Sequence, residues 1–166
     1  MIRHLSFTCA LLFSLLLHAK GRHEIGLLAG PLLIADAVEV MPAYGGRATI
    51  ALNSSHIKHI EIQGLKASTE SGINYALGEL TFRNEFEVEK ISALWLLGFN
   101  WHHYQPRLNG EYTDKRGWHV GTGINLEVNK NTMFRNDYIL HFAGGMSLVV
   151  TLGFSWAFGA PDEKKN

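Results

Sequence analysis

Cysteine and net charge are both scarce in this chain of 166 residues. It contains a single cysteine, Cys9, which excludes an internal disulfide and a zinc centre built from cysteines. Lysine and arginine total 15, and aspartate and glutamate also total 15, so the formal net charge is zero. A chain without a basic excess binds phosphate poorly, and we do not expect nucleic acid to be its partner.

Long apolar runs are also missing after the N-terminus, where the longest, residues 91–99, is far shorter than the ~20 residues of a membrane helix. Residues 5–17 (LSFTCALLFSLLL) form a short apolar segment between a positively charged start and the small residue Ala19. This order predicts a secretory signal peptide over residues 1–19, with a retained membrane anchor as the alternative. The mature chain would then lack cysteine, because Cys9 leaves with the signal.

What the sequence does contain is alternation with a period of two. Large apolar side chains occupy every second position from Leu148 to Phe158, and mostly small or polar residues lie between them. Side chains of a β-strand alternate between two faces, so this pattern predicts a strand with one apolar face. The same period predicts eight strands, at 24–34, 44–53, 57–66, 74–86, 91–102, 117–129, 133–142 and 148–158. They would form one domain over residues 20–159, followed by a short solvated tail at 160–166.

The predicted connections alternate between short and long. Polar turns are expected at 53–56, 87–89 and 130–132, and longer connections at 35–43, 67–72 and 105–116, with a short glycine link at 143–145. Outer-membrane barrels have tight turns on the periplasmic side and longer loops outside the cell. The connection at 105–116 is the longest and most charged, which makes it the best candidate for a contact with another molecule, with a merely mobile loop as the alternative.

Two classes of protein show this alternation, and they differ in the direction of the apolar face. Soluble sandwiches and lipocalin-like barrels bury that face, whereas a membrane barrel turns it to lipid and keeps a polar interior. The second face of this chain carries small residues such as Gly121, Gly153 and Ser155, which fit the narrow interior of an eight-stranded barrel. We therefore predict an all-β fold, an eight-stranded antiparallel up-and-down transmembrane β-barrel.

The last strand carries a more specific pattern. Thr151, Gly153, Trp156 and Phe158 occupy the four places of a polar residue, a glycine and two aromatic residues. This pattern resembles the C-terminal signal by which Gram-negative outer-membrane barrels are recognised for assembly, although eight residues follow Phe158 where the phenylalanine is often terminal. The chain is similar to the small outer-membrane β-barrel proteins. That resemblance implies an outer-membrane location and no single activity.

The alternation of side chains between the two faces of each strand (strand parity) also predicts which charged residues point into the barrel. Unpaired charges away from bulk water are costly, so we expect these side chains to pair in the lumen, with solvated charges in a wet lumen as the alternative. The predicted lumenal polar cluster consists of Arg47, Glu61, Glu79, Glu127, Arg135, Asp137 and His141, with His59 and Arg83 on the same face.

Signals for a metal, a cofactor or catalysis are weak. Adjacent residues of a strand point to opposite faces, so His102 and His103 cannot bind one metal from the same face, and no metal or cofactor is predicted. His141, Asp137 and Ser147 are the nearest set to a nucleophile with its base and orienting group. The His-x-Ser-Asn pattern that we associate with lipid A deacylases is absent, since His141 is followed by Phe-Ala, and no enzyme activity is predicted.

These inferences converge on an integral outer-membrane protein with a structural or interaction role. Its expected partners are the lipids of the outer membrane, the barrel-assembly machinery and an extracellular ligand that contacts the loops. Three alternatives remain open at this point: a lipid A-modifying enzyme, a narrow channel, and a soluble lipocalin-like binder of the periplasm.

Overall fold

Eight strands and parts of the connections between them make up the part of the chain that the structure describes. The computed structural model describes residues 23–35, 39–52, 59–69, 74–105 and 111–158, so the predicted signal peptide at 1–19 and the tail at 160–166 lie outside it. No helix in the described residues is long and apolar enough to span a membrane. The strands are β1 (His23–Ile34), β2 (Glu39–Ala51), β3 (His59–Ser68), β4 (Asn74–Val88), β5 (Ile91–Tyr104), β6 (Thr113–Asn129), β7 (Thr132–Phe142) and β8 (Met146–Phe158).

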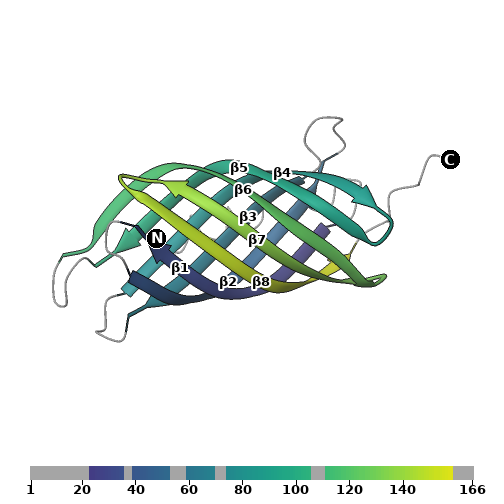
Figure 1. The fold of residues 1–166 in the computed structure, drawn as a ribbon, viewed down its shortest axis with the longest axis horizontal. Helices are drawn as coiled ribbons and strands as arrows, with labels where there is room; N and C mark the ends of the chain where they lie inside the picture. The colour runs from purple at the N-terminus through teal and green to yellow at the C-terminus, as the bar shows by residue number, and fades with distance from the viewer. Residues whose placement is uncertain (1–22, 36–38, 53–58, 70–73, 106–110, 159–166) are drawn as a thin grey trace, which may run out of the picture.

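The strands form a closed barrel in which every strand pairs with its sequence neighbours. All pairs are antiparallel, and β1 closes the barrel against β8 through a ladder that runs from His23–Phe158 to Ile34–Ser147. The strands lie tilted around the barrel axis (Figure 1). The predicted eight-stranded antiparallel up-and-down barrel is confirmed. Closure removes the free strand edges that an open sheet would expose.

Several strands begin earlier than the sequence pattern predicted. β2 begins at Glu39 rather than Tyr44, and its Pro42 faces Pro31 across the ladder, so the missing N–H groups of both prolines fall at one point. β6 begins at Thr113 rather than Gly117, because the charged segment 113–116 continues the alternation and pairs with the end of β5. The connections predicted at 35–43 and 105–116 are therefore shorter than expected.

The two faces of the barrel differ as the alternation predicted. Leu152, Phe154, Trp156 and Phe158 of β8 are each about half exposed on the outside, and the residues between them are buried. The same holds on β5, where Trp95 and Phe99 are 64% and 63% exposed. Large apolar side chains thus cover the outer face of a closed barrel.

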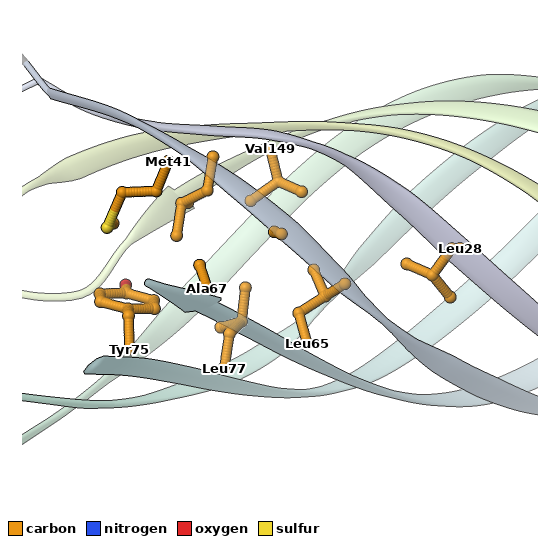
Figure 2. Close-up of a cluster of buried hydrophobic side chains, with 9 residues drawn as sticks. Leu28, Met41, Leu65, Ala67, Tyr75, Leu77 and Val149 are labelled. Carbon is orange, nitrogen blue, oxygen red and sulfur yellow. The ribbon is translucent and has the colours of Figure 1, made fainter. Parts of the chain in front are cut away.

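One end of the interior is apolar, which the sequence analysis did not predict. The cluster consists of Leu28, Leu32, Met41, Ala43, Leu65, Ala67, Tyr75, Leu77 and Val149. Figure 2 shows these side chains directed toward one another from β1, β2, β3, β4 and β8. Most lie near the connections that follow β1 and β3. A smaller cluster of Leu94, Leu96 and Ile139 packs inside β5 and β7. The interior therefore contains apolar as well as polar side chains.

Close approach of β2 and β3 depends on a glycine. A Cβ atom on Gly45 would lie 1.8 Å from the carbonyl oxygen of Gly64, so β3 would have to move away. We expect Gly45→Ala to lower the free energy of unfolding by about 1–3 kcal/mol, the usual cost of overpacking. Urea titration in lipid vesicles measures the change. Gly64→Ala is the matched control, because nothing lies within 4 Å of its added Cβ. Equal stability of the two variants would contradict the close packing.

Candidate functional site

A network of buried ion pairs lies inside the barrel. Arg83 on β4 is fully buried and contacts three carboxylates, from Glu24 at 2.7 Å, Glu85 at 2.6 Å and Glu61 at 3.3 Å. The Thr49 hydroxyl donates a further hydrogen bond to Glu61 at 3.1 Å. Alternation places Thr49, Glu61, Arg83 and Glu85 inside, because the neighbours of each along its strand are more exposed.

The second half of the network crosses the lumen. Arg135 on β7 donates two hydrogen bonds, of 2.5 and 3.1 Å, to Glu61 on β3, a strand on the far side of the barrel. Arg135 also contacts Asp137 at 2.6 Å, and Asp137 accepts a hydrogen bond of 2.8 Å from Arg47. Arg47 also donates hydrogen bonds to the hydroxyl of Ser155. Buried charges are tolerated when paired in this way, and these side chains fill the lumen where they meet.

A histidine cluster lies beside the network. Glu79 accepts a hydrogen bond from the Gln63 amide at 3.2 Å and lies 2.6 Å from Nε2 of His141. The rings of His102 and His119 both meet the ring of His141 edge to face, with centroids 5.3 and 5.5 Å away.

Two hydroxyl groups support this cluster. The Thr81 hydroxyl lies 3.0 Å from Nε2 of His119, and the Tyr75 hydroxyl contacts Nδ1 of His102. Four strands, β4 to β7, therefore contribute to one compact group of imidazole and carboxylate side chains.

The predicted lumenal residues fall into two groups. Six are buried inside the barrel, and the contacts above join them to one another or to other interior residues: Arg47, Glu61, Glu79, Arg135, Asp137 and His141. Glu127 differs, because it is only half-buried near the end of β6, beside a shift in register between Glu127 and Asn129. Its neighbours Leu126 and Val128 are exposed, so Glu127 keeps the inward parity that was predicted but is less buried than the other six. At a barrel end, inward parity no longer implies burial.

Sequence reasoning missed several members of the site. Glu24, Gln63, Glu85, His102 and His119 are all buried inside the barrel and contact its charged or imidazole groups. Each occupies an inward position of its strand, so a full application of the alternation would have found them. The choice of partner was not readable, because it depends on the register of neighbouring strands, as for Gln63 and Glu79, and on which strands approach inside the barrel, as for Glu24 and Arg83.

The candidate catalytic set does not assemble as a relay. His141 faces Ser147 across the β7–β8 ladder, but its Nε2 contacts Glu79 rather than Asp137. Asp137 is bound by Arg47 and Arg135 instead. A catalytic triad needs its acidic residue hydrogen-bonded to the histidine base. Here the acidic residue, Asp137, belongs to the ion-pair network instead.

The residues of the assembly pattern divide between the two faces. Thr151 and Gly153 point inward and are buried, whereas Trp156 and Phe158 are 47% and 48% exposed on the outside. The Phe158 ring packs against His23 of β1 at a centroid distance of 5.7 Å. The strand that closes the barrel thus presents both aromatic residues of the pattern outward.

At the end of the barrel opposite to His23 and Phe158, β5 and β6 carry a polar surface beside the connection between them. The rings of His103 and Tyr112 stack at 4.5 Å, and His103 contacts the Asp114 carboxylate at 2.7 Å. Lys115 donates to the carbonyl of Gly144 at 2.9 Å and lies over the Tyr104 ring. These contacts hold charged and aromatic side chains together at the surface that we name the β5–β6 rim.

Comparison with known proteins agrees with this geometry. No protein-family model matches the chain, and no curated protein matches it. Solved structures do: neisserial surface protein A is 10% identical over 82% of this chain and 96% of its own, with a TM-score of 0.63. The N-terminal β-barrel domain of Pseudomonas aeruginosa OprF is 10% identical over 85% of this chain and 100% of its own, with a TM-score of 0.61.

The attachment invasion locus protein Ail of Yersinia pestis is 14% identical, over 84% of this chain and 99% of its own, with a TM-score of 0.58. The chain therefore has the fold of the small eight-stranded outer-membrane barrels. At these identities the likeness establishes the fold, and the role has to be argued from the residues of this chain.

Proposed function

We propose that this protein is an integral outer-membrane barrel with a structural or interaction role, exported by the signal at 1–19. The observation that carries the proposal is the direction of the two faces. Buried arginine and carboxylate side chains occupy the interior, and the outer face exposes large apolar residues such as Leu27, Trp95 and Phe99. A soluble lipocalin-like barrel requires the opposite arrangement, with its apolar face buried.

Contact with membrane lipid has a suitable place on the outer face. A groove of about 750 Å³ runs over β4 to β7, and its outward-facing lining includes Phe82, Trp95, Leu97, Val120 and Leu140. Such a surface is costly in water and matches acyl chains. A second proposed partner is the barrel-assembly machinery, which would contact β8 from outside. The exposed side chains of Trp156 and Phe158 support this proposal.

The β5–β6 rim is the proposed contact region for an extracellular ligand. Its stacked His103 and Tyr112 and its charged Asp114 and Lys115 offer both polar and aromatic contacts. The structural neighbour Ail has been solved in complex with the heparin analogue sucrose octasulfate, which supports this proposal by analogy of fold.

A narrow channel is less well supported. Arg135 and Glu61 meet across the lumen, and the apolar cluster around Leu32 and Met41 occupies one end of it. Eight strands leave an interior just wide enough for side chains. Here side chains occupy it both where Arg135 meets Glu61 and at the end that holds the apolar cluster. The lipid A-modifying enzyme is supported less still, since Asp137 is bound by arginines rather than by His141.

The orientation of the barrel can be tested by labelling engineered cysteines on intact cells. Glu111, beside the rim, and Asn131, in the turn between β6 and β7, are both exposed and lie at opposite ends of the barrel. We expect Glu111→Cys to react with a membrane-impermeant maleimide and Asn131→Cys to stay unlabelled until the outer membrane is permeabilised. The only natural cysteine, Cys9, lies in the predicted signal and gives no background in the mature protein.

The wild-type chain is the control for labelling without an engineered cysteine. Labelling of Asn131→Cys alone would invert the proposed orientation. Equal labelling of both variants in a protein released without detergent would contradict the membrane location.

A further inference from the structure

We propose that the histidine cluster inside the barrel, formed by Glu79, His119 and His141 with His102 beside them, is a zinc site. These residues come from β4, β5, β6 and β7, and every one of them is at least nine-tenths buried. One ligand atom from each of Glu79, His119 and His141 can be chosen so that all three lie within 4.8 Å of one another. Ligand atoms around a tetrahedral zinc lie roughly 3.3–3.5 Å apart, given bonds of about 2.0–2.1 Å, so small side-chain movements close the site.

The imidazole groups have unused nitrogen atoms. Nδ1 of His119, Nδ1 of His141 and Nε2 of His102 are buried, and none has a hydrogen-bond partner among the described residues. Leaving three buried polar atoms unmatched within one cluster is costly. Neutral imidazole nitrogen is the commonest protein ligand for zinc, and the cluster has imidazole nitrogens free to bind an ion.

The carboxylate of the cluster also lacks the kind of partner that the other buried carboxylates have. Arg47, Arg83 and Arg135 bind Glu24, Glu61, Glu85 and Asp137. Glu79 instead contacts the Gln63 amide and the His141 ring. A divalent cation would supply the positive charge that the arginines supply elsewhere in the lumen.

A second group of similar composition shows why this site is the favoured one. Glu24, His59 and Glu85 also bring their ligand atoms within 4.8 Å of one another. Arg83 lies against both carboxylates of that group, at 2.7 and 2.6 Å, and occupies the place that a cation would take. The histidine cluster has no arginine in this position among the ion pairs of the described residues.

Two supporting residues would orient the ligands. The Gln63 amide donates to the second oxygen of Glu79, and the Thr81 hydroxyl contacts one nitrogen of His119. Hydrogen bonds of this kind fix the tautomer and direction of a ligand. Two imidazole nitrogens, from His119 and His141, and one carboxylate oxygen, from Glu79, make a donor set of borderline softness in a closed environment, and a third imidazole, His102, lies beside it. Such a set suits zinc better than magnesium or calcium.

The test measures metal in the full-length barrel, purified in detergent and loaded with zinc during refolding. We expect about one zinc ion per chain to survive extensive dialysis, and cobalt loaded in its place to show the intense visible absorption of tetrahedral coordination. His119→Gln should lower zinc affinity at least about 100-fold, and Gln63→Leu should lower it about 10-fold to 100-fold by releasing Glu79.

His103→Gln is the matched control, because His103 neighbours His102 on the same strand and faces outward. It should bind zinc as the wild type does. Heat-dependent mobility on gels verifies that each variant folds, and the cobalt spectrum of the wild type decides the matter if His119→Gln does not fold. A folded wild type without bound zinc and without the cobalt spectrum would overturn the proposal. So would equal loss of zinc in His119→Gln and His103→Gln.

Discussion

Replacing Arg135 with leucine is expected to lower the free energy of unfolding by about 3–5 kcal/mol, one of the two largest single-site effects that we anticipate. Arg135 is fully buried and bridges Glu61 and Asp137 across the lumen. Removing it leaves two carboxylates with fewer positive neighbours in a site closed to bulk water. The loss should be read from urea titrations of the barrel in lipid vesicles, where stability falls linearly with denaturant.

Arg116→Leu provides the matched comparison. Arg116 is an exposed arginine on β6, so its replacement should change stability by less than about 0.5 kcal/mol. Arg135→Lys tests the geometry, because lysine keeps the charge and loses the two parallel hydrogen bonds to Glu61. We expect it to fall between the wild type and Arg135→Leu. If Arg135→Leu were as stable as Arg116→Leu, the charged side chains would be solvated rather than paired.

The second large effect concerns the outer face. Leu152 lies in the middle of β8, points outward and is 52% exposed. If this face lies in lipid, Leu152→Arg should lower stability by about 2–4 kcal/mol, the cost of a charged side chain near the middle of the bilayer. Unfolding in vesicles, with the fraction of folded barrel followed on unheated gels, gives the measurement.

The control for this variant is an arginine at an outward position nearer the membrane interface. Val88 is 72% exposed at the end of β4, beside the turn to β5, where an arginine would reach the interface. Val88→Arg should therefore cost no more than about 1 kcal/mol. A soluble barrel would tolerate both changes equally, because both positions would face water. Equal small effects at Leu152 and Val88 would thus contradict the membrane location.

Much of the fold was predictable because one physical rule governs it. Side-chain alternation places Leu152 outside and Thr151 inside, and the same rule locates eight strands and their faces. Strand ends were harder to place. Pro42 and the charged segment 113–116 resemble loop residues, yet pairing with a neighbouring strand continues through both. Ladder geometry, rather than composition, decides where such a strand ends.

The site was only partly predictable for a different reason. Parity places Glu61 and Arg135 on the inner face, but their pairing depends on β3 and β7 lying opposite each other in the closed barrel. His102, His119 and His141 come together on three consecutive strands, and the β6–β7 register places His119 directly opposite His141. Their spacing along the chain carries no ligand pattern, which is why sequence reasoning predicted no metal. The apolar cluster at one end of the lumen was missed because inward positions were expected to be polar or small.

The most direct test of the central claim is envelope fractionation followed by electrophoresis of boiled and unboiled samples. In a closed barrel every strand edge is paired, so the folded form resists detergent until it is heated. We predict that the protein is found in the outer-membrane fraction and that its mobility on the gel changes on boiling. A protein released into the soluble periplasmic fraction without detergent, with the same mobility before and after boiling, would contradict the account.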